Sequence, residues 1–277
     1  QRAFKYNIEI ETLNIPSSVT KIDNQAFHFC SKLKTLTFEP NSKLQYIGLQ
    51  SFMNTALQTV IIPGSVTKIN NQAFDQCKQL NSLTFEPNSK LDYIGIGAFR
   101  YNESLSSDLI IPASVTAIQS YAFYNCKQLK TLTFEPNSKL LYIGPNAFSY
   151  TIIQSVQIPS SVKEIYNQAF ESTQLNSLTF EPNSKLRTIY ESAFKFNEYL
   201  TTVTIPASVE TIKNNAFNMC TELNELIFES GSKIHTIEAY AFDNTKLSGT
   251  ITITRIPNLS TLKSASAFPS SVNIVVQ

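Results

Sequence analysis

A small residue followed by phenylalanine recurs along the whole 277-residue chain, and this repeat constrains the fold more than any other feature. Successive phenylalanines of this kind, here called marker phenylalanines, are 22 to 26 residues apart. They are Phe4, Phe27, Phe52, Phe74, Phe99, Phe123, Phe148, Phe170, Phe194, Phe217, Phe242 and Phe268. Self-similarity at a short period predicts a solenoid, because a single unit of this size buries its apolar face only against its neighbours.

Two kinds of unit alternate. One contains Ile-Pro-x-Ser-Val, at residues 15–19, 62–66, 111–115, 158–162 and 205–209. The other contains Phe-Glu-Pro-Asn-Ser-Lys-Leu, at 38–44, 85–91, 134–140 and 180–186, with a divergent copy at 228–234. The alternating units have about 22 and 25 residues, so the true period is a pair of about 47 residues. We predict a single solenoid of about eleven to twelve units over residues 1–277, with 254–277 as an irregular C-terminal unit or cap.

Each unit is expected to contain one short strand. Leu36 and Phe38 are apolar at period two, and Thr35 and Thr37 alternate with them. This pattern is typical of a half-buried strand, and Pro40 then ends it because proline cannot donate to a ladder.

The segment around the marker phenylalanine is expected to form a turn or two of helix. Ile22, Ala26, Phe27, Cys30 and Leu33 have spacings that fit an apolar stripe on one helix face. The predicted fold class is therefore an α/β solenoid, a leucine-rich-repeat horseshoe or curved ribbon. Its parallel sheet would lie on the concave side, with short helices or turns on the convex side.

The combined pattern resembles the BspA-like class of leucine-rich repeats. Residues 15–52 show it in full: IPSSVTKIDNQAFHFCSKLKTLTFEPNSKLQYIGLQSF. Members of that family are commonly surface or secreted proteins of anaerobic bacteria and mucosal flagellate parasites, and several are implicated in adhesion to host cells and matrix proteins. The resemblance implies a cell-surface or secreted location and an adhesive role. Gln1 is not an initiator residue, which suggests a segment of a longer protein.

Four cysteines occupy one repeat position, three residues after a marker phenylalanine: Cys30, Cys77, Cys126 and Cys220. Neighbouring cysteines of this set belong to units at least two apart, so their Cα atoms should be at least about 9 Å from each other. A disulfide requires a shorter separation. We predict a structural ladder of buried free thiols and no metal site.

The sequence offers no arrangement typical of catalysis. It contains no nucleophile elbow, phosphate loop, metal-ligand pair or dinucleotide fingerprint. We expect no catalytic residue, no cofactor and no enzymatic activity. The 22 basic and 21 acidic side chains nearly balance, which argues against nucleic acid as a partner. The sequence contains no run of 18 apolar residues, so we predict no membrane insertion by this segment.

Glutamate and lysine recur four residues apart in every second unit. The glutamates are Glu39, Glu86, Glu135, Glu181 and Glu229, and the lysines are Lys43, Lys90, Lys139, Lys185 and Lys233. They are interpreted either as an ion pair inside each turn or as a charged rim for a partner. We favour the ion pair, because the two charges neutralise each other locally.

The outward side chains of the strands form the candidate binding face, rich in hydroxyl groups with scattered aliphatic residues. The candidates are Thr35, Thr37, Glu39, Ile61, Ser82, Thr84, Glu86, Asp108, Ile110, Thr131, Thr133, Glu135, Ser177, Thr179, Glu181, Thr202 and Thr204. Such a surface suits contact with a protein or glycan better than enclosure of a small molecule. We give equal weight to the alternative that this face is an ordinary solvent-exposed β surface with no ligand.

Three hypotheses remain for function: an adhesin-like recognition module, a structural spacer or self-associating segment of a larger protein, and an intracellular partner-binding module. Extra residues between Leu105 and Ile111 predict a bulge that redirects the binding face. Asn102 and Asn258 are in glycosylation sequons, and Asn258 is the better candidate because Asn102 occupies a buried repeat position.

Overall fold

The computed structural model describes residues 2–253 and 266–276 of the chain. The chain divides into two compact units: residues 1–140 and 150–152 form unit 1, and residues 141–149 and 153–277 form unit 2. Each unit is a parallel β-solenoid, with about eleven turns in total. The described residues contain β-strands and turns but no helix.

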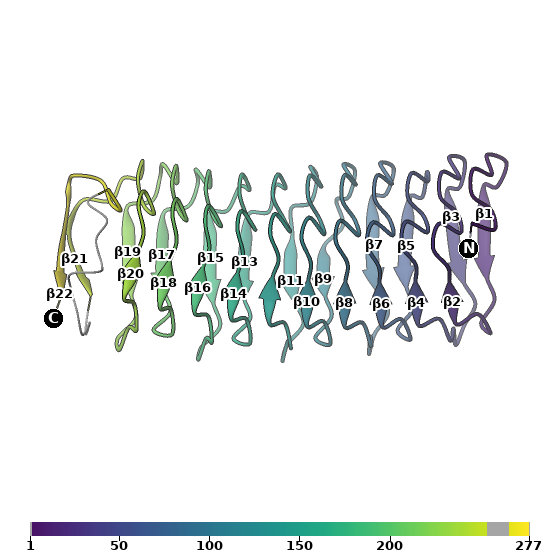
Figure 1. The fold of residues 1–277 in the computed structure, drawn as a ribbon, viewed down its shortest axis with the longest axis horizontal. Helices are drawn as coiled ribbons and strands as arrows, with labels where there is room; N and C mark the ends of the chain where they lie inside the picture. Colours follow the sequence, from purple (N-terminus) through teal and green to yellow (C-terminus); the bar gives the residue numbers. More distant parts are fainter. Residues whose placement is uncertain (1, 254–265, 277) are drawn as a thin grey trace. The chain divides into compact units, whose positions relative to one another are not determined.

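Most turns of the solenoid combine one long strand with one two-residue strand (Figure 1). The long strands of unit 1 are β1 (Thr12–Ile15), β3 (Thr35–Phe38), β5 (Thr59–Ile62), β7 (Ser82–Phe85), β9 (Leu109–Ile111) and β11 (Leu132–Phe134). Its short strands are β2 (Lys21–Ile22), β4 (Tyr46–Ile47), β6 (Lys68–Ile69), β8 (Tyr93–Ile94) and β10 (Ala117–Ile118), hydrogen-bonded in that order.

Unit 2 repeats this arrangement. Its short strands are β12 (Tyr142–Ile143), β14 (Glu164–Ile165), β16 (Thr188–Ile189), β18 (Thr211–Ile212) and β20 (Thr236–Ile237). Its long strands are β13 (Ser155–Ile158), β15 (Ser177–Phe180), β17 (Thr202–Ile205), β19 (Glu225–Phe228), β21 (Gly249–Ile253) and β22 (Val272–Val276). Of the predicted C-terminal cap, residues 254–265 lie outside the described residues, and β22 pairs in parallel with β21.

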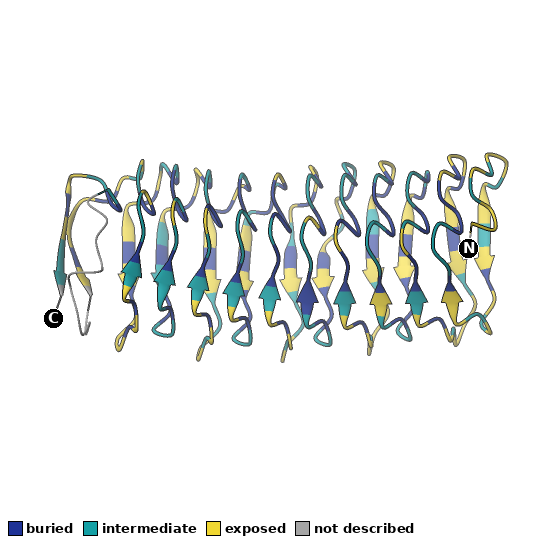
Figure 2. Ribbon diagram, in the orientation of Figure 1, coloured by how far each residue is buried: buried dark blue, intermediate teal, exposed yellow. Residues whose placement is uncertain are grey.

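The period-two prediction for the long strands is confirmed. Leu36 is buried while Thr35 and Thr37 are exposed, and Figure 2 shows this alternation along the long strands. The short strands were not predicted, because two residues are too few to show a period. Their isoleucines, such as Ile47 and Ile189, are fully buried and close the core from the other side.

The marker phenylalanines form a continuous stack of rings within each unit. In unit 1 the centroids from Phe4 to Phe123 are 5.2 or 5.3 Å apart, with interplanar angles of 2° to 9°. In unit 2 the centroids from Phe148 to Phe268 are 5.0 to 5.5 Å apart. Near-parallel rings at this separation are offset, an arrangement that aromatic pairs favour. This stack explains why the marker is invariably phenylalanine.

The predicted short helices are wrong. Residues two before and two after a marker phenylalanine adopt positive φ, as at Gln25 (57°) and Phe29 (60°), and this pattern recurs along both units. A residue in that region cannot continue a right-handed helix. The apolar stripe from Ile22 to Leu33 is therefore produced by a string of tight turns.

Hydrogen bonds between successive turns of the solenoid stabilise this conformation instead of intrahelical ones. The N–H groups of Gln25, Phe27 and Phe29 donate to carbonyl groups of the following turn, at 2.8 to 2.9 Å. The side chain of Asn24 also accepts a hydrogen bond from the following turn, from Leu49 N–H. Tertiary pairing thus overrides a periodicity that is compatible with a helix.

The long strands associate in twos, which is the structural counterpart of the 47-residue period. Each strand that leads into Ile-Pro pairs fully with the following strand that leads into Phe-Glu, as in β5–β7 and β13–β15. Between such pairs the ladder opens. One residue pair, Thr35 with Thr59, joins β3 to β5, and within the described residues no strand pairing joins β7 to β9 or β15 to β17.

The predicted bulge between Leu105 and Ile111 is wrong. β9 pairs with β11 in uninterrupted register from Leu109 to Ile111. The additional residues Ser106, Ser107 and Asp108 lie ahead of the strand, and the N–H groups of Ser106 and Ser107 donate to Asn81 C=O in the preceding turn. They occupy the opening between β7 and β9.

Candidate functional site

The long strands present the predicted binding residues on one outer face in each unit. All seventeen are exposed or half-exposed, and Ile61 and Ile110 each have 51% of their surface accessible. The register places hydroxyl and aliphatic groups side by side, as in Thr84 with Ile61 and Thr133 with Ile110. These placements put hydroxyl and aliphatic groups on the same outer face of each unit.

The glutamates of this set have a structural contact that the sequence did not reveal. The carboxylate of Glu39 accepts from Ser17 N–H in the preceding turn of the solenoid, at 2.9 Å. Glu86, Glu135, Glu181 and Glu229 make the equivalent contact at 2.8 to 2.9 Å. The residue whose N–H donates to the glutamate also accepts a hydrogen bond at its C=O, from the N–H of the lysine four residues after the glutamate. Lys43 N–H, for example, donates to Ser17 C=O. Each Phe-Glu-Pro-Asn-Ser-Lys loop therefore clamps the Ile-Pro turn before it.

The predicted Glu–Lys ion pairs are wrong: among the described residues, none of the five pairs forms an ion pair. The carboxylates face the backbone of the neighbouring turn rather than the lysine ammonium groups. The Phe-Glu-Pro-Asn-Ser-Lys loop is two residues longer than the Ile-Pro turn. This length allows the glutamate carboxylate and the lysine N–H to bind the same residue of the preceding turn. The two kinds of unit that alternate in the sequence therefore have different hydrogen-bonding roles. The longer loop of one kind binds the Ile-Pro turn of the other kind.

The opening between β15 and β17 forms a groove of about 350 Å³ on the outer face of unit 2. Four of the predicted residues, Ser177, Thr179, Thr202 and Thr204, line it. Asn176, Thr201 and Glu229 complete its polar lining, and Leu178 and Phe180 contribute to its floor. The groove therefore gathers a subset of the predicted face into one concave site.

Backbone groups of both strands face this groove. In a parallel ladder the N–H and C=O of one residue point to one side and those of the next residue to the other. Glu181 N–H donates to Ile158 on the β13 side, so the groups of Leu178 and Phe180 point toward β17. By the same alternation, Glu229 N–H to Ile205 places the groups of Thr202 and Thr204 toward β15.

The equivalent opening in unit 1 is bridged by a side chain. Leu83, which corresponds to Leu178, donates its N–H to Ser107 Oγ at 3.1 Å. The same hydroxyl donates to Leu83 C=O at 3.5 Å. A hydroxyl group thus satisfies the strand edge between β7 and β9, whereas unit 2 has no additional residue before β17.

The four cysteines are buried free thiols, as the repeat spacing predicts. Each thiol donates to the carbonyl of the marker phenylalanine in the preceding turn, for example Cys77 to Phe52 at 3.1 Å and Cys220 to Phe194 at 3.3 Å. Burial raises the pKa of Cys77 and of Cys220 to about 12. These thiols are therefore protonated structural groups rather than nucleophiles.

Two further titratable groups, Asp75 and His28, are buried. Asp75 is buried and pairs with Arg100 at 2.8 Å, and burial raises the pKa of its carboxyl group despite the ion pair. Burial lowers the pKa of His28. Within the part of the chain that the structure describes, no three His, Cys, Asp or Glu side chains cluster as metal ligands would. That part also has no helix of the length and hydropathy needed to cross a membrane.

The fold and its repeated clamps define a solenoid of the leucine-rich-repeat class. The family model for the BspA type leucine rich repeat region matches residues 1–130, 92–218 and 141–275, and the chain belongs to this family. None of the curated proteins matches the sequence.

Solved structures share the fold at low sequence identity. A leucine-rich repeat protein from Bacteroides ovatus is 22% identical, with a TM-score of 0.53 over 100% of this chain and 86% of that one. The pneumococcal vaccine antigen PcpA is 21% identical, with a TM-score of 0.55 over 96% and 72%. A leucine rich cell surface protein from Faecalibacterium prausnitzii is 22% identical, with a TM-score of 0.50 over 100% and 81%.

Sequence reasoning missed Asn176, Thr201 and Glu229 as groove residues and Ser107 as the residue that bridges the other opening. The groove depends on where strand pairing stops, which no single column of the repeat indicates. One feature of the sequence does distinguish the two openings. Three residues lie between Leu105 and Leu109 in unit 1, whereas two lie between the corresponding Leu200 and Val203 in unit 2.

Proposed function

We propose that the chain is a non-enzymatic recognition segment of a surface or secreted protein, with adhesin-like binding of a host-cell or matrix protein or glycan. The observation that carries this proposal is the groove between β15 and β17. It is an open polar site on the outer face of unit 2, and Ser107 bridges the corresponding opening between β7 and β9 in unit 1.

The chemistry of the groove suits a ligand rich in hydroxyl or amide groups. Threonine and serine hydroxyls both donate and accept, and the backbone groups directed toward the groove add donors and acceptors. The Ser107 hydroxyl between β7 and β9 shows what kind of group such an opening accommodates. A protein side chain, a peptide backbone or a sugar hydroxyl all meet that requirement.

Kinship supports the surface location. The chain belongs to the BspA-type family, and one similar structure is described as a cell surface protein and another as a vaccine antigen. Individual hydrogen bonds to an exposed groove are weak, so useful affinity requires several of them within the groove.

The test is binding of the purified chain to epithelial cells and to immobilised matrix proteins. The double variant Thr179→Tyr/Thr204→Tyr places two rings over the groove, and we expect its binding to fall by about tenfold. Binding is measured by surface plasmon resonance on the matrix proteins and by flow cytometry on the cells.

Thr84→Tyr/Ile110→Tyr is the matched control, because these residues hold the same positions beside the opening that Ser107 bridges. It should bind as the wild type does. Equal binding by both double variants, or no binding by the wild type to cells or matrix proteins, contradicts the proposal.

A further inference from the structure

A second concave site lies in unit 2, where the chain passes from long to short strands. It is a cleft of about 250 Å³, and four of its lining side chains are cationic: Lys163, Lys185, Arg187 and Lys233. Glu210 is the one carboxylate in the lining. Four cations and one carboxylate leave a local charge of +3 on a chain whose net charge is +1.

The solenoid backbone holds these charges in position. Arg187 N–H donates to Lys163 C=O and Glu210 N–H to Arg187 C=O, both at 2.8 Å, so these residues lie on three successive turns. Lys185 and Lys233 lie in two of the loops that bind the preceding Ile-Pro turn. Their N–H groups donate to Ser160 C=O and Ala207 C=O, both at 2.9 Å. The cations are therefore spread over four turns, which extend along the solenoid axis over about 14 Å.

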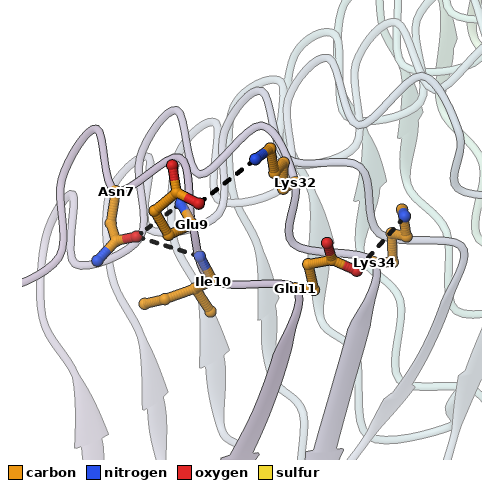
Figure 3. Close-up of polar contacts among 6 residues, drawn as sticks. All are labelled: Asn7, Glu9, Ile10, Glu11, Lys32 and Lys34. Carbon is orange, nitrogen blue, oxygen red and sulfur yellow. Dashed lines mark hydrogen bonds and ion pairs between the residues drawn. The ribbon is translucent and has the colours of Figure 1, made fainter.

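None of the four cations has a counter-ion among the described residues. Several lysines elsewhere on the surface are neutralised by a carboxylate of a neighbouring turn. Figure 3 shows Lys32 paired with Glu9 at 3.4 Å and Lys34 paired with Glu11 at 3.6 Å. The like charges of the cleft repel one another, and an anion from outside the described chain would relieve that repulsion.

Unit 1 provides an internal comparison. Asp92 N–H donates to Thr67 C=O and Thr116 N–H to Asp92 C=O, so these three residues are equivalent to Lys163, Arg187 and Glu210. Thr116 Oγ1 also donates to the Asp92 carboxylate at 2.6 Å. With the loop lysines Lys90 and Lys139, the equivalent set has a charge of only +1. The repeat framework therefore does not require the basic cleft.

We propose that this cleft binds sulfate groups of a linear sulfated glycan. Cations spread over four turns, with Glu210 on the third, fit a chain with repeated anionic groups better than a single small ion. The two cleft serines are already engaged: Ser184 Oγ accepts from Leu186 N–H and Ser208 Oγ donates to Leu186 C=O. Recognition rests on charge and spacing, and the choice of a glycan rather than another polyanion rests on the proposed surface function.

The test is calorimetric titration of the chain with a heparin hexasaccharide, with the desulfated hexasaccharide and with a short DNA duplex. The double variant Lys163→Thr/Arg187→Asp installs the residues of unit 1. We expect at least about tenfold weaker heparin binding by this variant. Lys78→Thr, an exposed lysine outside the cleft, should leave the affinity unchanged.

The reciprocal variant Thr67→Lys/Asp92→Arg gives unit 1 the four cations of the cleft, with Thr116 at the position of Glu210, and should raise the stoichiometry from one site to two. Heparin affinity should also fall steeply between about 0.05 and about 0.3 M sodium chloride. Circular dichroism checks that each variant remains folded.

Unchanged heparin binding by Lys163→Thr/Arg187→Asp overturns the inference, as does equal binding of the desulfated hexasaccharide. Binding of the DNA duplex as tight as that of heparin overturns the assignment to a glycan. Failure here is distinguishable from failure of the proposed function, because cell and matrix binding through the groove is measured with separate variants.

Discussion

Units 1 and 2 have the same framework but different surfaces. Both stack marker phenylalanines at about the same spacing, and both clamp Ile-Pro turns with a glutamate. At two equivalent places they differ: Ser107 bridges an opening in unit 1 that remains a groove in unit 2, and a nearly neutral set in unit 1 becomes the basic cleft of unit 2. The repeat fixes the framework, and function is expected where the framework leaves the side chain unconstrained.

If the frameworks are equivalent, removing one ring from either stack should be equally damaging. Phe99 and Phe194 are both fully buried, each between two stacked rings. We expect Phe99→Ala and Phe194→Ala each to lower the free energy of unfolding by about 3–5 kcal/mol in urea denaturation. Phe4→Ala is the control, because Phe4 is 46% exposed and should lose much less. A loss confined to one unit would break the comparison.

The thiols should be equally inert in both units. The pKa of Cys77 in unit 1 and of Cys220 in unit 2 is raised to about 12 by burial, so at pH 8 very little of either is thiolate. We expect alkylation by iodoacetamide to be slower than in the urea-unfolded chain on the order of a thousandfold, measured by peptide mass spectrometry. Because the folded state holds these protons more strongly than the unfolded state, their contribution to stability should be lost as pH rises from about 9 toward 12. Rapid alkylation of either thiol in the native chain would contradict this account.

The difference between the openings should be transferable. Replacing Thr201–Thr202 by Ser-Ser-Asp gives unit 2 the three residues found at 106–108 in unit 1. The new hydroxyl should bridge to Leu178, close the groove and weaken cell and matrix binding by about tenfold, with a melting temperature within a few degrees of the wild type. Full binding by this chimera would show that the groove is not the recognition site.

The sequence predicts the framework well because each repeat column is sampled about eleven times. The marker phenylalanines, the period-two strand from Thr35 to Phe38 and the thiol ladder all follow from that repetition. The helix prediction failed because spacing alone cannot distinguish a helix from a string of turns with positive φ at residues such as Gln25. Glutamine at that position gives no local signal, since the conformation is imposed by hydrogen bonds between turns.

The candidate site was predictable only in part, for a different reason. Ser177, Thr179, Thr202 and Thr204 were identified as outward-facing, but a further thirteen residues were indistinguishable from them. The four line an opening between β15 and β17 that remains a groove, whereas Ser107 bridges the corresponding opening between β7 and β9. The basic cleft is likewise assembled from residues that are far apart in sequence and unremarkable alone.

The smallest expected effect is also the most direct test of the bridging hydroxyl. Ser107→Ala removes the group that accepts from Leu83 N–H and donates to Leu83 C=O. Those backbone groups would then face an opening with no protein partner, and we expect a loss of about 1 kcal/mol in the free energy of unfolding. Ser106→Ala is the control, because Ser106 is exposed and adjacent but makes no such bridge. Amide hydrogen exchange at Leu83 should accelerate in Ser107→Ala alone. If stability and exchange are unchanged in both variants, the opening in unit 1 is not held by the serine, and its contrast with the groove of unit 2 would need another cause.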